Sequence, residues 1–114
     1  MIGVNDLLQG QNIEVMKENY TKIFTQVKEI PEVVILSLLP VYASAQTAMI
    51  NENIIRLNHF LRSECSKRGF LFIDLHKLMC DTDGGMKEEL TSDGVHLTPK
   101  AYTIWQQQLS TYFQ

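Results

Sequence analysis

The side chains best suited to chemistry in this chain of 114 residues are Asp93 and His96, which lie three residues apart in the sequence Ser-Asp-Gly-Val-His-Leu-Thr-Pro. An aspartate carboxylate that accepts the Nδ1–H of an imidazole fixes the tautomer of the ring and leaves Nε2 free to take a proton from a nucleophilic hydroxyl. General base catalysis of this kind accelerates reactions about 10²- to 10⁴-fold. The pair is therefore a candidate orienting acid and base of a hydrolytic enzyme.

A second candidate motif, Gly3-Val4-Asn5-Asp6, lies close to the N-terminus. The Asn5 amide can donate a hydrogen bond to a developing oxyanion, and Gly3, which lacks a Cβ, permits the tight turn that presents it. Taken alone, a histidine such as His96 is more often a surface or helix-capping residue than a base, and Asp93 more often a turn-former before a glycine. The occurrence of both motifs in one chain favours the catalytic interpretation.

Three helices are predicted to support these motifs. Apolar residues at spacings of three and four predict a helix over 13–27, with Asn12 as its N-cap and an end before the proline at 31. The same pattern predicts a helix over 50–68 that stops at a glycine. The last helix is predicted to begin with Thr98 as its N-cap and Pro99 as its first residue. Its apolar stripe is expected to lie in the core: Tyr102, Trp105, Leu109 and Tyr112.

Two buried strands are predicted on either side of the second helix. The nearly continuous apolar run 33–39 is typical of a strand that is buried on both faces, as in a parallel sheet, and 70–75 predicts a second strand. Strand, helix and strand form a βαβ unit, so both strands end at the same edge of the sheet, where open α/β folds bind their ligands. Residues 77–92 show an irregular pattern with a turn at 81–85. The fold class is α/β in a single domain, 1–114.

Composition excludes several functional classes. The net charge is −3 and no basic cluster is visible, so no nucleic-acid partner is expected. No apolar run is long enough for a membrane span and no signal peptide is recognisable, which predicts a cytoplasmic location. Cys65 and Cys80 lack metal-ligand spacing, and the acidic turn that begins at Asp81 has Ser92 where a calcium-binding loop needs its last carboxylate. Neither a metal nor another cofactor is expected.

The two motifs together carry a family resemblance. Gly3 to Asp6 resembles block III, and Asp93 to Leu97 resembles block V, of the SGNH (GDSL-type) hydrolases, a family of esterases, lipases and acylhydrolases. The resemblance implies a partial flavodoxin-like three-layer α/β/α fold that lacks its N-terminal strands. It also implies that Asn5 is an oxyanion donor, Asp93 the orienting acid and His96 the base, and that the substrate is a small ester or acyl compound.

The chain departs from the family pattern because the first block, which carries the nucleophilic serine, and the second block are absent. None of its serines lies in a strand-to-helix nucleophile elbow; Ser44, in the loop after the first strand, is the least implausible substitute. We therefore expect a truncated C-terminal portion of an ester hydrolase, close to inactive by itself. Two alternatives stay open: a non-catalytic, self-associating α/β relic, and one half of a split esterase.

The predicted strand 33–39 also has a consequence for assembly. In the family this strand pairs with the strand that leads into the Gly-x-Asn-Asp turn, of which only Met1 and Ile2 remain here. An apolar exposed strand edge is a template for pairing with another chain. A homo-oligomer formed through this edge is therefore predicted.

Overall fold

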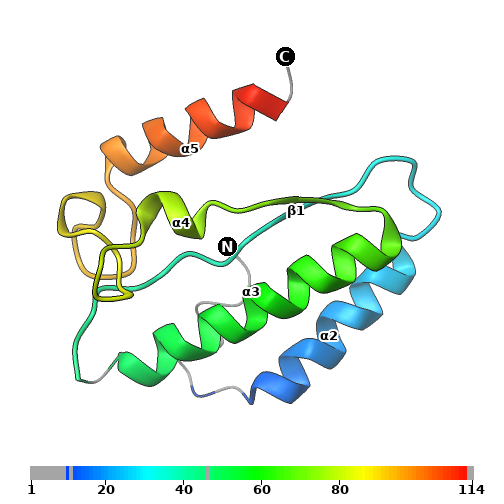
Figure 1. Ribbon diagram of the computed structural model, residues 1–114, viewed down its shortest axis with the longest axis horizontal. Coiled ribbons are helices and arrows are strands. Elements are labelled where there is room, and N and C mark those ends of the chain that lie inside the picture. The colour runs from blue at the N-terminus through cyan, green and yellow to red at the C-terminus, as the bar shows by residue number, and fades with distance from the viewer. Residues whose placement is uncertain (1–9, 11, 46, 113–114) are drawn as a thin grey trace.

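A computed structural model describes residues 10, 12–45 and 47–112 of the chain. A short parallel strand pair lies between helices on its two sides: α2 and α3 run next to each other on one side, and α5 lies on the other (Figure 1). The elements in chain order are α2 (Ile13–Gln26), β1 (Val34–Leu36), α3 (Ala48–Arg68), β2 (Leu71–Ile73), α4 (His76–Met79), the 3₁₀ helix η1 (Glu88–Leu90) and α5 (Pro99–Tyr112).

The helix boundaries follow from local signals in the sequence. The side chain of Asn12 accepts a hydrogen bond from the Glu14 N–H at 2.7 Å, which confirms the predicted N-cap of α2. Helix α3 ends at Gly69, whose φ of 74° is a left-handed conformation that glycine adopts at little cost. Pro99 is the first residue of α5, as predicted. Of the residues whose spacing predicted α2, Met16 is buried, whereas Ile23 is 42% exposed and its neighbour Phe24 is buried instead.

The two strands pair in parallel, as predicted, but both are shorter than the sequence pattern indicated. Val34 lies opposite Leu71 and Leu36 lies opposite Ile73, so the ladder covers three residues on each strand. After Leu36 the chain continues in a buried but irregular course, with only the Ser37 N–H still bonded to the Ile73 carbonyl, at 3.0 Å. The prediction of a strand over 33–39 is therefore wrong in its length, although its burial beyond Leu36 is correct.

Two asparagines of α3 satisfy the backbone that follows β1. The Asn58 amide accepts from the Leu38 N–H at 2.7 Å and donates to the Leu38 carbonyl at 2.9 Å. Asn51 makes the same pair of contacts with Val41, at 2.9 and 3.0 Å. The seven helical residues from Asn51 to Asn58 rise about 10.5 Å, and the three extended residues from Leu38 to Val41 span about 10 Å, so the two spacings match. Side-chain amides thus take the place of a neighbouring strand here, on the edge of the segment that faces away from β2. The ladder itself ends where β2 stops at Ile73 and the chain turns into α4.

Side chains of the strands alternate between two core clusters. Ile35 and Phe72 face the cluster formed by α2 and α3, whereas Leu36 and Ile73 face the cluster that includes α4 and α5. This alternation is the period-two pattern of a strand covered on both faces. The layers are therefore α/β/α, and the small parallel sheet is part of the fold that the sequence predicted.

Helix α5 is less buried than its apolar stripe indicated. Tyr102 is 57% exposed and Tyr112 is 44% exposed, so placing these two residues in the core is wrong. Ala101 is fully buried, and because successive helical residues differ by about 100°, Tyr102 points well away from the buried direction. Tyr102 stacks on the partly buried Trp105 instead, with ring centroids 6.1 Å apart.

The irregular region after β2 contains two short helices, α4 and η1, which were not predicted because one turn shows no periodicity. Its turn packs closely against the chain that follows β1: a Cβ at Gly85 would lie 2.6 Å from the Ala43 backbone nitrogen. The Met86 N–H donates to the Val41 carbonyl at 2.9 Å. This contact brings the loop after β1 and the loops before α5 to one end of the molecule (Figure 1).

Candidate active site

Asp93 and His96 face each other in the loop that precedes α5. The Asp93 Oδ2 atom lies 2.5 Å from the His96 Nδ1 atom. The other carboxylate oxygen, Oδ1, accepts two backbone hydrogen bonds, from the His96 N–H at 2.7 Å and from the Val95 N–H at 3.0 Å. One carboxylate thus holds both the imidazole and the backbone that carries it.

These contacts keep the carboxylate charged. The backbone N–H of His96, followed by its imidazole and the N–H of Val95, lowers the pKa of Asp93 well below the usual aspartate range. Because the pKa of this carboxyl is lower in the folded than in the unfolded chain, its ionised form stabilises the fold at pH values above the usual aspartate pKa. This stabilisation is lost as the pH falls through the lowered pKa. At neutral pH Asp93 is therefore an acceptor for the imidazole.

The imidazole is open to solvent. The His96 side chain is 81% exposed and that of Asp93 is 52% exposed. With Nδ1 held by Asp93, the Nε2 atom is the ring nitrogen available to a reactant. An orienting carboxylate and an accessible imidazole are two of the three groups in a serine-hydrolase triad.

Backbone contacts fix the loop to the rest of the fold. The Tyr42 N–H, just after the segment held by Asn51, donates to the Gly94 carbonyl at 2.8 Å. Thr91 and Leu97 form an isolated antiparallel bridge across the loop. At its end, the Thr98 hydroxyl accepts from the Ala101 N–H at 3.4 Å, which is the predicted N-cap of α5. The loop is thus tied to the end of the β1 segment and to the first turn of α5.

Gly94 has a conformation and a neighbour that disfavour a side chain. Its φ is +95°, and a Cβ there would lie 3.3 Å from the Cβ of Tyr42. We predict that Gly94→Ala lowers the free energy of unfolding by about 1–2 kcal/mol, measured by urea denaturation. Gly84→Ala is the control because Gly84 has a similar φ of +84° and open space around it. An equal loss of unfolding free energy in the two variants would show that the contact with Tyr42 does not contribute to the effect of Gly94→Ala.

A hollow of about 650 Å³ adjoins the pair on the side of Asp93. Tyr42, Ser44, Thr47 and Val95 belong to its lining, whereas His96 does not. The Ser44 Oγ atom lies 3.1 Å from the Thr47 Oγ1 atom, and the structure shows no contact between Ser44 and the imidazole among the described residues. Ser44 therefore lacks the hydrogen bond to a base that an activated nucleophile requires.

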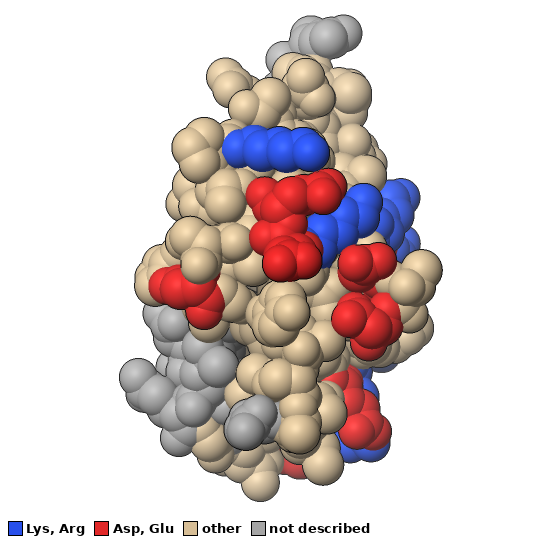
Figure 2. Space-filling view, turned by 90° about the vertical axis from the view of Figure 1, so that its left-hand side faces the viewer, with Lys and Arg blue, Asp and Glu red and all other residues tan. Residues whose placement is uncertain are grey.

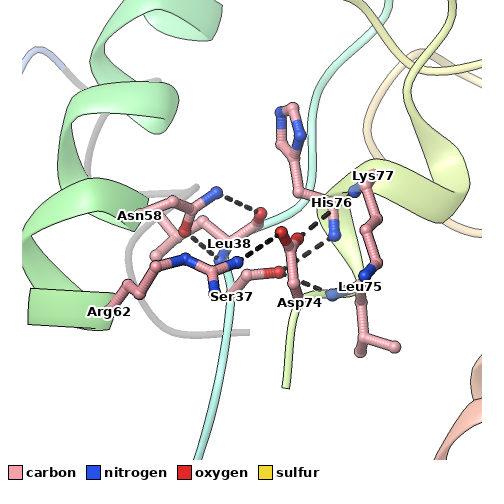
Figure 3. A network of polar contacts seen from close by, with 8 residues as sticks. All are labelled: Ser37, Leu38, Asn58, Arg62, Asp74, Leu75, His76 and Lys77. Carbon is pink, nitrogen blue, oxygen red and sulfur yellow. Dashed lines mark hydrogen bonds and ion pairs between the residues drawn. The ribbon is translucent and has the colours of Figure 1, made fainter. Parts of the chain in front are cut away.

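Ser37 has a structural role. It is buried, and its Oγ atom accepts the N–H groups of Leu75 at 2.9 Å and His76 at 3.0 Å, so it joins the end of the β1 segment to the start of α4 (Figure 3). In the same network the Arg62 guanidinium bonds the Asp74 carboxylate at 2.9 Å (Figure 3). These contacts place the carboxyl ends of both strands at one edge of the sheet, as the βαβ pattern predicted.

A small cavity of about 230 Å³ lies beside this network and is lined by Arg62, Phe72 and His76, among others. The His76 Nε2 atom is buried without a hydrogen-bond partner in the described part of the chain, and burial lowers the pKa of this imidazole. Arg62 is held by Asp74 and by the ring of Phe72, 4.9 Å away. This cavity is separate from the hollow beside Asp93 because the two share no lining residue.

The site residues predicted near the N-terminus, Gly3 and Asn5, lie outside the described residues. Sequence reasoning missed the side chains that hold the site in place, Thr91, Asn51 and Asn58, because their partners are backbone atoms, which leave no motif. Acidic and basic side chains are interspersed on the face that carries these loops (Figure 2). No helix within the described ranges is long and apolar enough to cross a membrane.

The three-layer α/β fold carries the Asp–His pair in a loop beyond the strand ends. The sequence profile of the GDSL-like lipase/acylhydrolase family matches residues 1–104. The chain therefore belongs to this family.

Solved structures share the fold. A protein from Streptococcus pneumonia described as a platelet activating factor superposes with a TM-score of 0.84 at 28% identity, covering 100% of this chain and 57% of that one. A GDSL-like lipase from Bacteroides thetaiotaomicron gives a TM-score of 0.75 at 20% identity, over 90% of this chain and 52% of the other. The chain thus spans about half the length of these proteins.

Among curated proteins, the N-acylneuraminate cytidylyltransferase of Streptococcus agalactiae serotype V is 28% identical over 111 residues. The match covers 97% of this chain and 26% of that protein. The chain therefore corresponds to about a quarter of this relative.

Proposed function

We propose that this chain supplies the base, the orienting acid and the side-chain oxyanion donor of an ester hydrolase whose nucleophilic serine lies outside these 114 residues. His96 is the base, Asp93 the acid and Asn5 the oxyanion donor. The observation that carries the proposal is the 2.5 Å contact between Asp93 Oδ2 and His96 Nδ1, combined with the exposure of the imidazole. Family membership supports the reaction class.

In the proposed mechanism the serine hydroxyl attacks the acyl carbonyl of a small ester while His96 Nε2 takes its proton. The negative charge on the carbonyl oxygen is held by the Asn5 amide, and Asp93 stabilises the imidazolium. The imidazolium then protonates the leaving alcohol. Water, deprotonated by the same imidazole, hydrolyses the acyl-enzyme and regenerates the serine.

The test compares the chain by itself with a completed domain. The 114-residue chain is expected to hydrolyse p-nitrophenyl acetate no faster than an equal concentration of free imidazole. Joined at Met1 to the part of the Streptococcus pneumonia relative that this chain does not cover, it is expected to turn over the ester enzymatically. Turnover by the isolated chain, or a folded but inactive joined protein, would contradict the proposal.

We also propose that the chain by itself forms a homo-oligomer through the outer edge of β1. Among the described residues β1 pairs only with β2, and the side chain of Val34 is exposed. Because Asn58 occupies the backbone groups of Leu38, the available edge is limited to β1 itself, 34–36, rather than to the whole of 33–39. Such an edge is a pairing template.

Sedimentation velocity over a hundredfold range of protein concentration tests this association. A weight-average mass that rises with concentration is expected, and Val34→Lys is expected to reduce it because a charge on an edge strand opposes pairing. Tyr112→Lys, on the far helix α5, is the control and should leave the association unchanged. A monomer at every concentration would overturn this proposal.

A further inference from the structure

We propose that Thr91 is a positioning residue for the Asp93–His96 pair, acting through two hydrogen bonds between its hydroxyl and the backbone of the loop. Its catalytic significance rests on the function proposed above, whereas its structural effect on the pair does not. Thr91 belongs to neither sequence motif and does not touch the His96 ring, so it would act only through the loop.

The Thr91 hydroxyl closes the loop at both ends of the segment that carries the pair. Its Oγ1 atom accepts from the Gly94 N–H at 2.9 Å and donates to the His96 carbonyl at 2.8 Å. The two N–H groups between these points, those of Val95 and His96, are accepted by Asp93 Oδ1. Three successive N–H groups are therefore satisfied by two side chains, Thr91 and Asp93.

The exposure of the pair makes these bonds important. A buried catalytic side chain is held by packing, but the His96 side chain is 81% exposed and that of Asp93 is 52% exposed. Their relative position therefore depends on the loop backbone, because Asp93 is oriented by the N–H groups of the segment that also carries His96. Besides Thr91, the Ser92 N–H reaches the His96 carbonyl, at the longer distance of 3.3 Å.

Thr91→Val removes the hydroxyl and keeps the branched shape of the side chain. The Gly94 N–H and the His96 carbonyl then lose their shared partner, and the 94–96 segment is expected to shift relative to the carboxylate. Thr91→Ser keeps the hydroxyl and is expected to preserve the loop. The matched control is Thr103→Val in α5, where the hydroxyl donates to a backbone carbonyl, that of Pro99, at 3.0 Å and lies away from the loop.

Nuclear magnetic resonance on the 114-residue chain provides a direct readout. The Asp93 carboxyl carbon is titrated, because the N–H groups of His96 and Val95 and the His96 imidazole lower the pKa of this carboxyl. In Thr91→Val the titration midpoint is expected to rise toward the usual aspartate range and the His96 Nδ1–H signal to weaken. Thr91→Ser and Thr103→Val are expected to match the wild type. Thr91→Ala, with less bulk, should repeat the shift if the valine variant does not fold.

Unchanged Asp93 and His96 signals in folded Thr91→Val or Thr91→Ala would overturn the proposal, as would an equal change in Thr103→Val. This readout needs no ester hydrolysis, so it separates the two proposals. In the completed domain Thr91→Val is expected to lower kcat about 10- to 10²-fold with KM little changed, because small displacements of catalytic groups cost about this much. Shifted signals in a completed domain that lacks activity would refute the hydrolase function and leave the positioning role standing.

Discussion

Replacing His96 by alanine in the completed domain is expected to lower kcat/KM for p-nitrophenyl acetate by about 10²- to 10⁴-fold, which is the usual contribution of a general base. Asp93→Asn is expected to have an effect of similar size. An asparagine amide that presents its NH₂ group to Nδ1 favours the tautomer with the proton on Nε2, and this atom can then no longer accept the proton of the nucleophile. Initial-rate kinetics at neutral pH measure both effects.

A matched histidine provides the control. His59 is an exposed histidine of α3 that does not contact the Asp93–His96 loop, and His59→Ala is expected to keep the full rate. Because the His96 side chain is 81% exposed, His96→Ala is also expected to change the free energy of unfolding by less than about 0.5 kcal/mol. A His96→Ala enzyme that keeps the wild-type rate would remove this histidine from the mechanism.

The pH dependence follows from the electrostatics of Asp93. The contacts with His96 and Val95 lower the pKa of its carboxyl, so this group stays ionised throughout the range in which esters are assayed. Protonation of Asp93 is therefore expected to make no contribution to the pH–rate profile between pH 5 and 8. A loss of activity within that pH range must therefore be caused by the titration of another group.

Much of the fold could be predicted because the residues that begin and end a helix lie close to it in the sequence. Asn12, Gly69 and Pro99 mark helix ends, and the structure confirms all three. The loop with Asp93 and His96 could also be recognised, because its own carboxylate organises it over only three residues. Signals of this kind act over short distances along the chain and are readable without knowledge of the tertiary structure.

The remaining features depend on contacts between distant segments. The early end of the ladder follows from β2, which stops at Ile73, after which the Leu75 N–H bonds the Ser37 hydroxyl from 38 positions away in the chain. The apolar run 33–39 does not show where its partner strand stops, so it was interpreted as a full strand. Tyr102 was placed in the core for a related reason: a helical stripe identifies an apolar face but not how far the neighbouring layer extends along it.

Asn51 is expected to have the largest effect on stability. Asn51→Leu keeps the branched outline of the side chain but removes the Oδ1 acceptor of the buried Val41 N–H, which has no other acceptor in the described part of the chain. The Val41 carbonyl keeps the Met86 N–H as a donor, at 2.9 Å. One buried N–H left unsatisfied costs about 1–3 kcal/mol, and urea unfolding monitored by circular dichroism measures this loss.

Two other asparagines of α3 serve as comparisons for the Asn51→Leu variant. The Asn53 side chain makes no hydrogen bond among the described residues, and Asn53→Leu is expected to be neutral or slightly stabilising because leucine is the better helix former. Asn58→Leu is expected to cost less than Asn51→Leu, because its partly buried position allows water to reach the Leu38 N–H. If Asn51→Leu were no more destabilising than Asn53→Leu, the amide would not be needed to hold the segment.

The effect of Asn51 extends to the loop that carries Asp93 and His96, through the segment that Asn51 holds. Val41 is followed by Tyr42, whose N–H donates to the Gly94 carbonyl between Asp93 and His96. Release of Val41 is therefore expected to loosen the loop, so that hydrogen exchange of the Tyr42 N–H becomes faster in Asn51→Leu under native conditions. Unchanged exchange at Tyr42 in a destabilised Asn51→Leu variant would show that the loop is anchored independently of α3.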